Sequence, residues 1–337
     1  MSETKDIITM AHGSGGQASH ELMSRVFGKY FHNEILDALE DAAVLDVEAG
    51  KLAYSTDSFV VTPLFFKGGN IGKLCIAGTV NDLLMMGAEP KYLTCGFIIE
   101  EGFPIDDLDR IAATMAEEAA KAGVLIAAGD TKVVDGQGGL YINTSGIGVI
   151  PEGRAARAAN MKKGDKIILS GNLGDHQACI YSARMGIENE IQSDCGVLKD
   201  ITDALYGAGI IPHTMRDVTR GGLGTILNEL CKAAGCGMRI EESQIPVDDK
   251  VAGLAGILGL DPLYMANEGK MIAVVAEEDA DKGNDSEKDE VEPAPEQFLA
   301  PKPDPNPASG KEQNRANDEY GDELLFLNDG EPEDGAQ

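Results

Sequence analysis

The chain has 337 residues, of which 43% are apolar and 5% aromatic, with 41 glycines and no tryptophan. This length fits two ordinary domains better than one, and the glycine content argues against a helical bundle. The formal net charge of −29 argues against nonspecific nucleic-acid binding and favours solubility. The six cysteines form no C-x-x-C pair. Without a signal peptide or a long apolar span, we expect a cytoplasmic chain that does not enter a membrane.

Residues 1–150 alternate between strand-like and helix-like segments and form the first predicted domain. The apolar patterns predict strands over residues 51–55, 92–99, 124–128 and 141–149, and helices over residues 20–30, 71–86 and 105–122. The last of these helices has acidic residues early and Lys121 late, as the helix dipole prefers, and Gly123 follows as its stop signal.

Residues 151–276 form a second predicted α/β domain after a link rich in arginine and alanine. Strands are predicted over residues 166–170, 238–240 and 271–275, and helices over residues 221–234 and 247–258. A glycine-rich loop, residues 171–176, follows the first of these strands. The alternation predicts an α/β (α+β) fold of two related domains, although the sequence has no strict internal repeat.

Residues 277–337 differ in composition from the rest of the chain. They carry 20 acidic and 5 basic residues and half of the chain's 14 prolines. Such a segment buries too little apolar surface to offset its ordering entropy, so we expect an acidic, proline-rich disordered tail. Residues 324–327 are its one apolar cluster.

Four aspartates lie at or near the ends of predicted elements in the first domain: Asp41, Asp57, Asp82 and Asp130. Polar groups at strand ends meet at one edge of an α/β sheet, and several carboxylates there would repel one another unless they held Mg²⁺. Each aspartate taken singly has a second explanation, because aspartate is also common in helix caps and turns.

A glycine-rich loop that contains Gly13, Ser14, Gly15 and Gly16 precedes the helix-like residues 20–30. Backbone amides in such a loop can bind phosphate, but no G-K-[ST] follows, so the loop is not a P-loop. A flexible turn is the alternative interpretation.

Several other side chains could carry chemistry. Lys132, two residues after Asp130, could contact phosphate or move a proton, and Glu268 could act as a general base. Exposed, structural positions are the alternative for both residues. Further candidates are His176, His213, Asp217 and Arg220.

Six motifs follow one another along the chain: Ala11-His12-Gly13-Ser14-Gly15-Gly16, Ser55-Thr56-Asp57-Ser58, Pro63-Leu64-Phe65-Phe66-Lys67-Gly68-Gly69-Asn70-Ile71-Gly72-Lys73-Leu74, Gly129-Asp130-Thr131-Lys132-Val133-Val134, Arg216-Asp217-Val218-Thr219-Arg220-Gly221-Gly222 and Ala266-Asn267-Glu268-Gly269-Lys270. Together and in this order, they resemble the AIR-synthase-like superfamily, and within it the HypE family of hydrogenase-maturation proteins. The resemblance covers residues 7–275.

The resemblance implies a two-domain fold and a homodimer in which the first domains pair through their sheets. It implies ATP in the first domain, with Mg²⁺ held by Asp57, Asp82 and Asp130, and with Asp41 as a further ligand. The nucleotide-binding positions that it implies are Gly13, Ser14, Gly15, Gly16, Asp57, Asn81, Asp82, Asp130 and Thr131.

The reaction that the resemblance implies is the ATP-dependent dehydration of an S-carbamoyl cysteine to a thiocyanate, the source of the cyanide ligands of [NiFe] hydrogenases. Lys132 and Glu268 match the positions that suit its proton transfers. The implied partners are a HypF-like carbamoyltransferase and a HypC–HypD-like iron scaffold complex.

The sequence departs from the family pattern at its C-terminal end. The family ends in a short tail whose cysteine accepts the carbamoyl group, whereas no cysteine follows Cys236 here. A disrupted end and a divergent tail are both open explanations. Two other functions also remain open: a non-catalytic scaffold, and another ATP-dependent phosphotransferase of the superfamily. A selenophosphate synthetase is disfavoured, because the N-terminal loop holds His12 and Ser14 instead of a cysteine.

Overall fold

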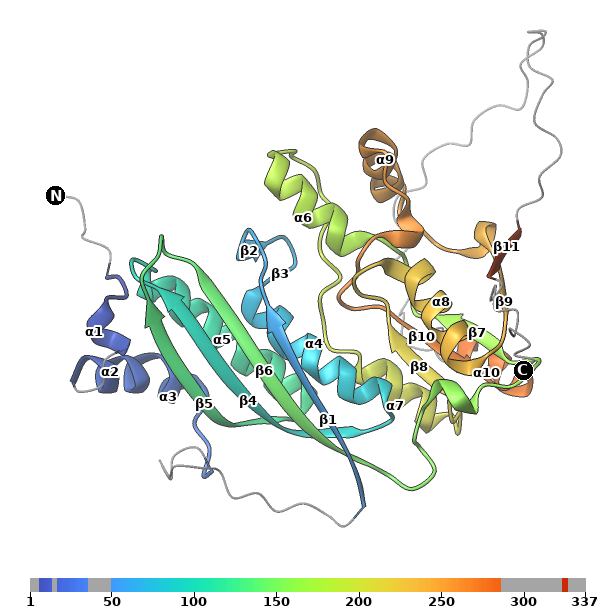
Figure 1. Cartoon of the computed structure of the whole chain (residues 1–337), viewed down its shortest axis with the longest axis horizontal. Coiled ribbons are helices and arrows are strands. Elements are labelled where there is room, and N and C mark those ends of the chain that lie inside the picture. Colours follow the sequence, from blue (N-terminus) through green and yellow to red (C-terminus); the bar gives the residue numbers. More distant parts are fainter. Residues whose placement is uncertain (1–5, 14–16, 36–49, 286–322, 327–337) are drawn as a thin grey trace, which may run out of the picture.

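The computed structural model describes residues 6–13, 17–35, 50–285 and 323–326 of the chain. They form two α/β domains that lie side by side (Figure 1). Within these residues no helix is both long and apolar enough to cross a bilayer. Asp41, Ser14, Gly15 and Gly16 lie outside the described residues, so the predictions made for them are not addressed by the structure.

The first domain contains a four-stranded sheet with two long helices on one of its faces (Figure 1). Its elements, in chain order, are α1 (Met10–Gly13), α2 (Gln17–Leu22), a π-helical turn (Met23–Phe27), α3 (Gly28–Tyr30), β1 (Lys51–Phe59), β2 (Phe65–Phe66), β3 (Gly69–Asn70), α4 (Ile71–Met85), β4 (Glu89–Glu100), α5 (Ile105–Ala122), β5 (Leu125–Val134) and β6 (Leu140–Ile150).

The strand order of this sheet is β1-β6-β4-β5. Strand β6 pairs antiparallel with both β1 and β4, while β4 and β5 are parallel and joined through α5. The helices α4 and α5 pack together on one face of the sheet. Exposed side chains such as Tyr54, Ile98 and Tyr141 lie on the other face. We call this uncovered side the open face.

Helix α4 connects the two domains. Asn70 caps its N-terminus by accepting hydrogen bonds from the amides of Gly72 and Lys73, at 2.8 and 3.1 Å. Twelve of its fifteen residues are buried, so the helix is apolar on nearly all sides, as expected for a helix enclosed within a protein. It contacts β1 and β6 of the first domain, and β8 and α7 of the second.

The second domain is built on a smaller sheet with strand order β7-β10-β8, antiparallel throughout. Its elements, in chain order, are a 3₁₀ turn (Ala158–Asn160), β7 (Lys166–Leu169), α6 (Asp175–Met185), α7 (Lys199–Gly207), β8 (Thr214–Asp217), α8 (Gly222–Ala234), β9 (Met238–Glu241), a 3₁₀ turn (Glu242–Gln244), α9 (Asp249–Leu258), a 3₁₀ turn (Pro262–Tyr264), β10 (Met271–Val275), α10 (Glu277–Asp285) and β11 (Glu323–Phe326).

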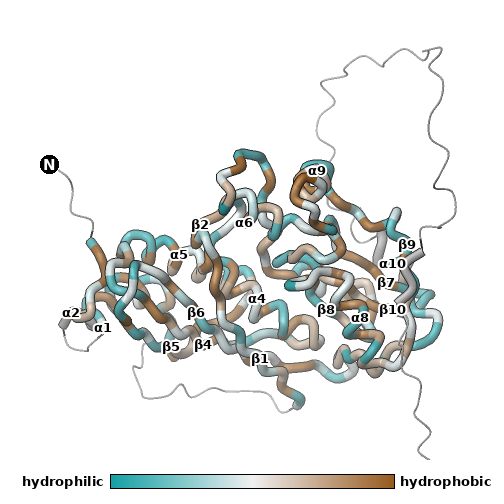
Figure 2. Tube along the Cα trace, turned by 45° about the horizontal axis from the view of Figure 1, so that its top comes forward, coloured by the Kyte–Doolittle hydropathy of each residue, from teal (hydrophilic) through white to brown (hydrophobic). Residues whose placement is uncertain are grey.

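The largest apolar core runs across both domains. It contains Ile76 and Val80 of α4, Leu93 of β4 and Ile111 of α5, and it continues to Met271 of β10. A separate cluster under α8 includes Leu223, Leu227 and Ile272. Figure 2 shows apolar residues along the strands of both sheets and along the helices that cover them. The shared core fixes the two domains against each other.

Two predicted strands are longer than expected, and this changes the position of two aspartates. Asp57 lies inside β1, paired with Thr144, and Asp130 lies inside β5, paired with Gly96. Both had been expected after their strands. Ladder hydrogen bonds to neighbouring strands extend these segments through polar residues that carry no apolar signal of their own.

Other differences concern elements without a clear apolar period. Helices α6 and α7 and strand β8 were not predicted. Helix α10 forms the first nine residues of the segment expected to be a disordered tail, and Lys166 of β7 pairs with its Glu277 at 3.0 Å. Strand β11 pairs antiparallel with β9. The rest of that segment lies outside the described residues.

Candidate functional site

A group of carboxylates lies where α4 meets the second domain. We call it the seam cluster, and it consists of Asp57, Asp82, Asp217 and Glu268. The charges of these four residues act on one another. They come from β1, α4, the end of β8 and the loop before β10. The cluster therefore depends on both domains being docked together.

Strand alternation explains why β1 contributes to the seam cluster. Ala53 and Phe59 of β1 are buried and face α4, so Ser55 and Asp57, at the same parity, face it as well. The Ser55 hydroxyl donates a 2.6 Å hydrogen bond to the Asp82 carboxylate. Burial raises the pKa of Asp82, and the negative charge of Asp57 raises it further. The serine bond opposes this shift, because it stabilises the ionised form.

Asp217 and Glu268 have the largest pKa shifts in the seam cluster. Burial raises the pKa of Asp217 to about 7, with a further contribution from Asp82. Burial also raises the pKa of Glu268 to about 8, helped by the charges of Asp194 and Asp217. A carboxyl group with such a pKa holds a proton near neutral pH and can exchange it there, as a general acid or base must.

A second pair of the predicted residues lies on the open face, at β5. Asp130 and Lys132 are two positions apart, so they point the same way, and Lys132 Nζ contacts both carboxylate oxygens of Asp130 at 2.7 and 2.8 Å. Both side chains are well exposed. The hydrogen bond from Lys132 lowers the pKa of Asp130. They line a shallow pocket of about 280 Å³ together with Ile98, Tyr141 and other open-face residues.

The start of the N-terminal glycine loop lies beside this pair. A Cβ on Gly13 would stand 2.8 Å from the Cβ of Val133, so only glycine allows α1 to approach β5 this closely. Thr131, on the same strand, is partly buried. Gly13 of α1 therefore lies beside β5, the edge strand that carries the predicted nucleotide positions Asp130 and Thr131.

Within one chain, the seam cluster and the Asp130–Lys132 pair are separate. The strands β1 and β5 are at opposite edges of the sheet, and Asp57 faces α4 whereas Asp130 faces the open side. Among the described residues, no three His, Cys, Asp or Glu side chains form a group able to hold a metal ion. A single chain thus brings Asp57 and Asp82 together but leaves Asp130 apart.

Asn81 has a structural role in this chain. Its side-chain amide donates to the carbonyl of Gly196 at 3.0 Å, and its oxygen accepts from the amide of Leu198 at 2.9 Å. The side chain is buried, so these bonds join α4 to the segment that precedes α7. This contact had not been predicted, since Asn81 was selected only as a nucleotide-binding position.

Of the remaining candidates, the two histidines have structural partners. His176 Nδ1 lies 2.8 Å from the Ser193 hydroxyl, and burial lowers the pKa of His176 to about 4. His213 Nδ1 lies 2.7 Å from Asp165. Arg220 is exposed, and its charge acts on Glu268.

Sequence reasoning missed Asp194. It lies in the run Ser193-Asp194-Cys195-Gly196, between two helices that the apolar period did not predict. Its carboxylate accepts hydrogen bonds from the amides of Glu268 and Gly269. An acidic residue two positions before a glycine, in a segment without apolar periodicity, was the available signal.

Comparisons with known proteins agree with this architecture. Residues 39–150 match the family described as AIR synthase related protein, N-terminal domain, and residues 162–294 match AIR synthase related protein, C-terminal domain. The carbamoyl dehydratase HypE of Azotobacter vinelandii is 46% identical over 279 residues, which is 82% of each chain. The chain belongs to the HypE family of AIR synthase related proteins.

Solved structures show the same relationship. A crystal structure of the hydrogenase maturation protein HypE in complex with ATP superposes with a TM-score of 0.79 at 44% identity, covering 83% of this chain and 84% of that one. HypE from a HypE–HypF complex superposes with a TM-score of 0.67 at 44% identity, covering 79% and 88%. The second-domain match reaches residue 294, beyond the point where the motifs end.

Proposed function

We propose that this chain is a carbamoyl dehydratase that uses ATP to convert an S-carbamoyl cysteine into a thiocyanate during hydrogenase maturation. Membership of the HypE family supports the reaction class. The observation that carries the proposal is Glu268, whose pKa is raised to about 8 by burial and neighbouring carboxylates. Removing protons from a weakly acidic amide nitrogen requires a base with a high proton affinity.

The reaction balances as carboxamide plus ATP giving nitrile, ADP and phosphate. The carboxamide oxygen takes the γ-phosphoryl group, which turns a poor leaving group into a good one. The amide nitrogen loses two protons and the C–O bond breaks. In this proposal Glu268 accepts a proton from the nitrogen, and Lys132 stabilises phosphoryl charge or moves a proton.

ATP and Mg²⁺ are the proposed ligands of the first domain. The partly buried carboxylates Asp57 and Asp82 fit a divalent cation, because they are hard oxygen donors, and because burial and then the charge of Asp57 raise the pKa of Asp82. Bound Mg²⁺ would supply charge stabilisation for the transferred phosphoryl group. Asp130, Thr131, Lys132 and the loop that begins at Gly13 are the proposed phosphate-binding part.

A homodimer is part of the proposal. Asp130 and Lys132 lie on the open face, away from the seam cluster of the same chain. Pairing of two open faces would cover the exposed Tyr54 and Ile98, which are 70% and 47% exposed. An Ile98→Glu substitution is expected to give monomers in sedimentation equilibrium. An unchanged dimer would contradict pairing through this face.

The proposed partners follow from the family. A HypE protein has been crystallised with HypF, and we propose that a HypF-like carbamoyltransferase supplies the carbamoyl group here. A HypC–HypD-like iron scaffold complex is the proposed acceptor of the cyanide group. All six cysteines lie in the described residues, and only Cys236 is exposed. An S-carbamoyl cysteine peptide is therefore the appropriate substrate for an assay.

Calorimetry with the full chain tests the nucleotide half of the proposal. We expect binding of ATP that depends on Mg²⁺ and weakens by about tenfold or more in Asp82→Asn, because one carboxylate ligand is lost. The matched control is Asp203→Asn on α7, where the carboxylate is exposed and pairs with Lys199. Absence of ATP binding would exclude the proposed ATP-dependent dehydratase. Binding without turnover of the peptide would favour the scaffold function.

A further inference from the structure

Two short segments of the second domain are interlocked around Glu268. The Asp194 carboxylate accepts hydrogen bonds from the Glu268 amide at 3.2 Å and from the Gly269 amide at 3.0 Å. In the other direction, the Gly196 amide donates to the Glu268 carbonyl at 3.2 Å. A Cβ on Gly269 would stand only 1.9 Å from the Asp194 carbonyl oxygen. The backbone of Glu268 is thus held on both sides.

The segment that contains Asp194 is itself fixed to the first domain. Asn81 of α4 forms hydrogen bonds with Gly196 and Leu198, which follow Asp194 in the same segment. On the other side, the Ser193 amide donates to the carbonyl of Lys67 at 2.9 Å. The segment of Asp194 therefore connects the loop that contains Glu268 to helix α4. This helix also carries Asp82, the residue that follows Asn81.

We infer that Asp194 is a positioning residue for Glu268: it fixes the backbone of the general base and holds a second negative charge beside its carboxyl group. The inference rests on the proposed role of Glu268. The arrangement has a cost, because a partly buried carboxylate is held next to another acid. Burial raises the pKa of Asp194, while the charge of Lys270 and the two backbone amides oppose that shift, because they stabilise the ionised form.

The charges around Glu268 come from four directions. Asp194 from the interlocked segment, Asp217 from β8 and Asp57 from β1 raise its pKa, and Arg220 lowers it. After burial, Asp194 has the largest effect of these charges. Neutralising Asp194 should therefore lower the pKa of Glu268 and make it a weaker base, without replacing Glu268 itself.

An Asp194→Asn variant of the full chain tests the inference. The asparagine oxygen can still accept an amide hydrogen bond, so the main change is the loss of charge. We expect the titration midpoint of Glu268 to fall by about one pH unit, because a neighbouring like charge has been removed. Infrared difference spectra against Glu268→Gln isolate the protonated Glu268 carboxyl band, in metal-free buffer and without any substrate.

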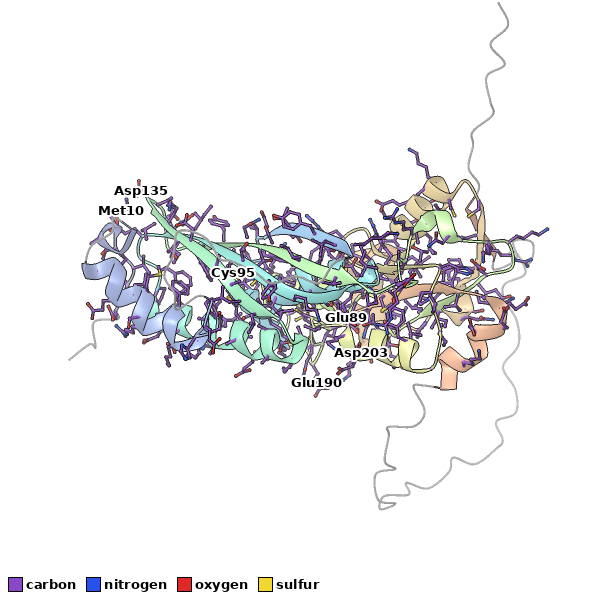
Figure 3. All side chains as sticks on the ribbon, turned by 90° about the horizontal axis from the view of Figure 1, so that it is seen from below. Met10, Glu89, Cys95, Asp135, Glu190 and Asp203 are labelled. Carbon is purple, nitrogen blue, oxygen red and sulfur yellow. The ribbon has the colours of Figure 1, made fainter. Side chains whose placement is uncertain are left out.

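The control and the second variant separate position from charge. Asp203→Asn, at a position labelled in Figure 3, removes an exposed carboxylate of the same domain and should leave the midpoint unchanged. Asp194→Glu keeps the charge and should keep the midpoint within about half a unit of the wild-type value. If Asp194→Asn fails to fold, an Asp194→Glu midpoint that falls overturns the inference.

Outcomes for this inference and for the proposed function are distinguishable. An unchanged Glu268 midpoint in Asp194→Asn, with wild-type chain that turns over the carbamoyl peptide, overturns the inference alone. A lowered midpoint in a chain that binds no ATP supports the inference and excludes the enzyme. Where turnover is measured, its pH profile should shift to lower pH in Asp194→Asn, whereas a purely structural defect would lower the rate equally at all pH values.

Discussion

The open face and the seam between the domains both hold acidic residues of the proposed site, but their surroundings act on them in opposite ways. Asp130 on the open face is exposed and paired with Lys132, which lowers its pKa. Glu268 in the seam is partly buried among carboxylates, which raises its pKa to about 8. The same functional group is kept ionised in one place and proton-binding in the other.

This difference matches the two tasks of the proposed reaction. A phosphate-binding edge needs fixed charges that do not change near neutral pH, and exposed pairs provide them. Proton transfer needs a group that titrates near the working pH, and such a group needs burial and like charge. Within one chain the two regions lie apart, with Asp130 on the open face of the first-domain sheet and Glu268 in the second domain, on the side of α4.

The largest expected effect follows from removing the base in the seam. Glu268→Gln should lower the rate of phosphate release with MgATP and an S-carbamoyl cysteine peptide by about 10²–10⁴-fold, the usual contribution of a general base. ATP affinity by calorimetry should stay similar, because the proposed nucleotide-binding residues are elsewhere. Glu190→Gln, an exposed position labelled in Figure 3, is the matched control. Full activity in Glu268→Gln would show that Glu268 is not the general base, and the proposed function depends on that role.

Much of the fold could be predicted from the sequence. Helix α5 has the predicted bounds, because its apolar period, acidic first turn and Gly123 all agree. Strand β10 is also as predicted, since it is a short run of five buried apolar residues. Where local propensity, burial pattern and stop signals coincide, the bounds of an element can be predicted without knowledge of its tertiary contacts.

The site was harder to predict, because it depends on contacts between distant segments. Asp57 and Glu268 are 211 positions apart, and no local pattern shows that their charges interact. Asp194 carries no apolar period and has a role only through the amides of Glu268 and Gly269. Asn81 was predicted as a nucleotide-binding position, and no local pattern shows the hydrogen bonds that its side-chain amide makes to Gly196 and Leu198.

A smaller effect should distinguish α4, which is enclosed on nearly all sides, from α9, which is buried on one side only. A Cβ on Gly72 would stand 2.5 Å from the Ile111 carbonyl oxygen of α5, so Gly72→Ala should destabilise the protein by about 1–3 kcal/mol through overpacking. A Cβ on Gly253 of α9 would meet nothing within 4 Å, so Gly253→Ala should stabilise the protein by about 0.5–1 kcal/mol. Thermal unfolding of both variants provides the measurement. A shift of the same sign in both would mean that enclosure of α4 is not what requires glycine.

The smallest expected effects are opposite pH trends in stability. The pKa of Glu268 is higher in the folded chain than in the unfolded one, so the folded state binds more protons between about pH 4.5 and pH 8, and this stability is lost as pH rises through that range. Relative to the wild type, Glu268→Gln should therefore gain melting temperature from pH 5 to pH 8.5 in metal-free buffer.

Asp130 should behave in the reverse sense. Its pKa is lower in the folded chain, so its contribution is present above the unfolded value near pH 3.8 and is lost as pH falls below it. Asp130→Asn should thus be slightly less stable than the wild type at pH 7, and the difference should shrink toward pH 3. Because the Asp130–Lys132 pair is exposed, the loss should also diminish in high salt, whereas the Glu268→Gln trend should persist. Equal salt sensitivity of the two trends would show that the seam is as open to solvent as the open face.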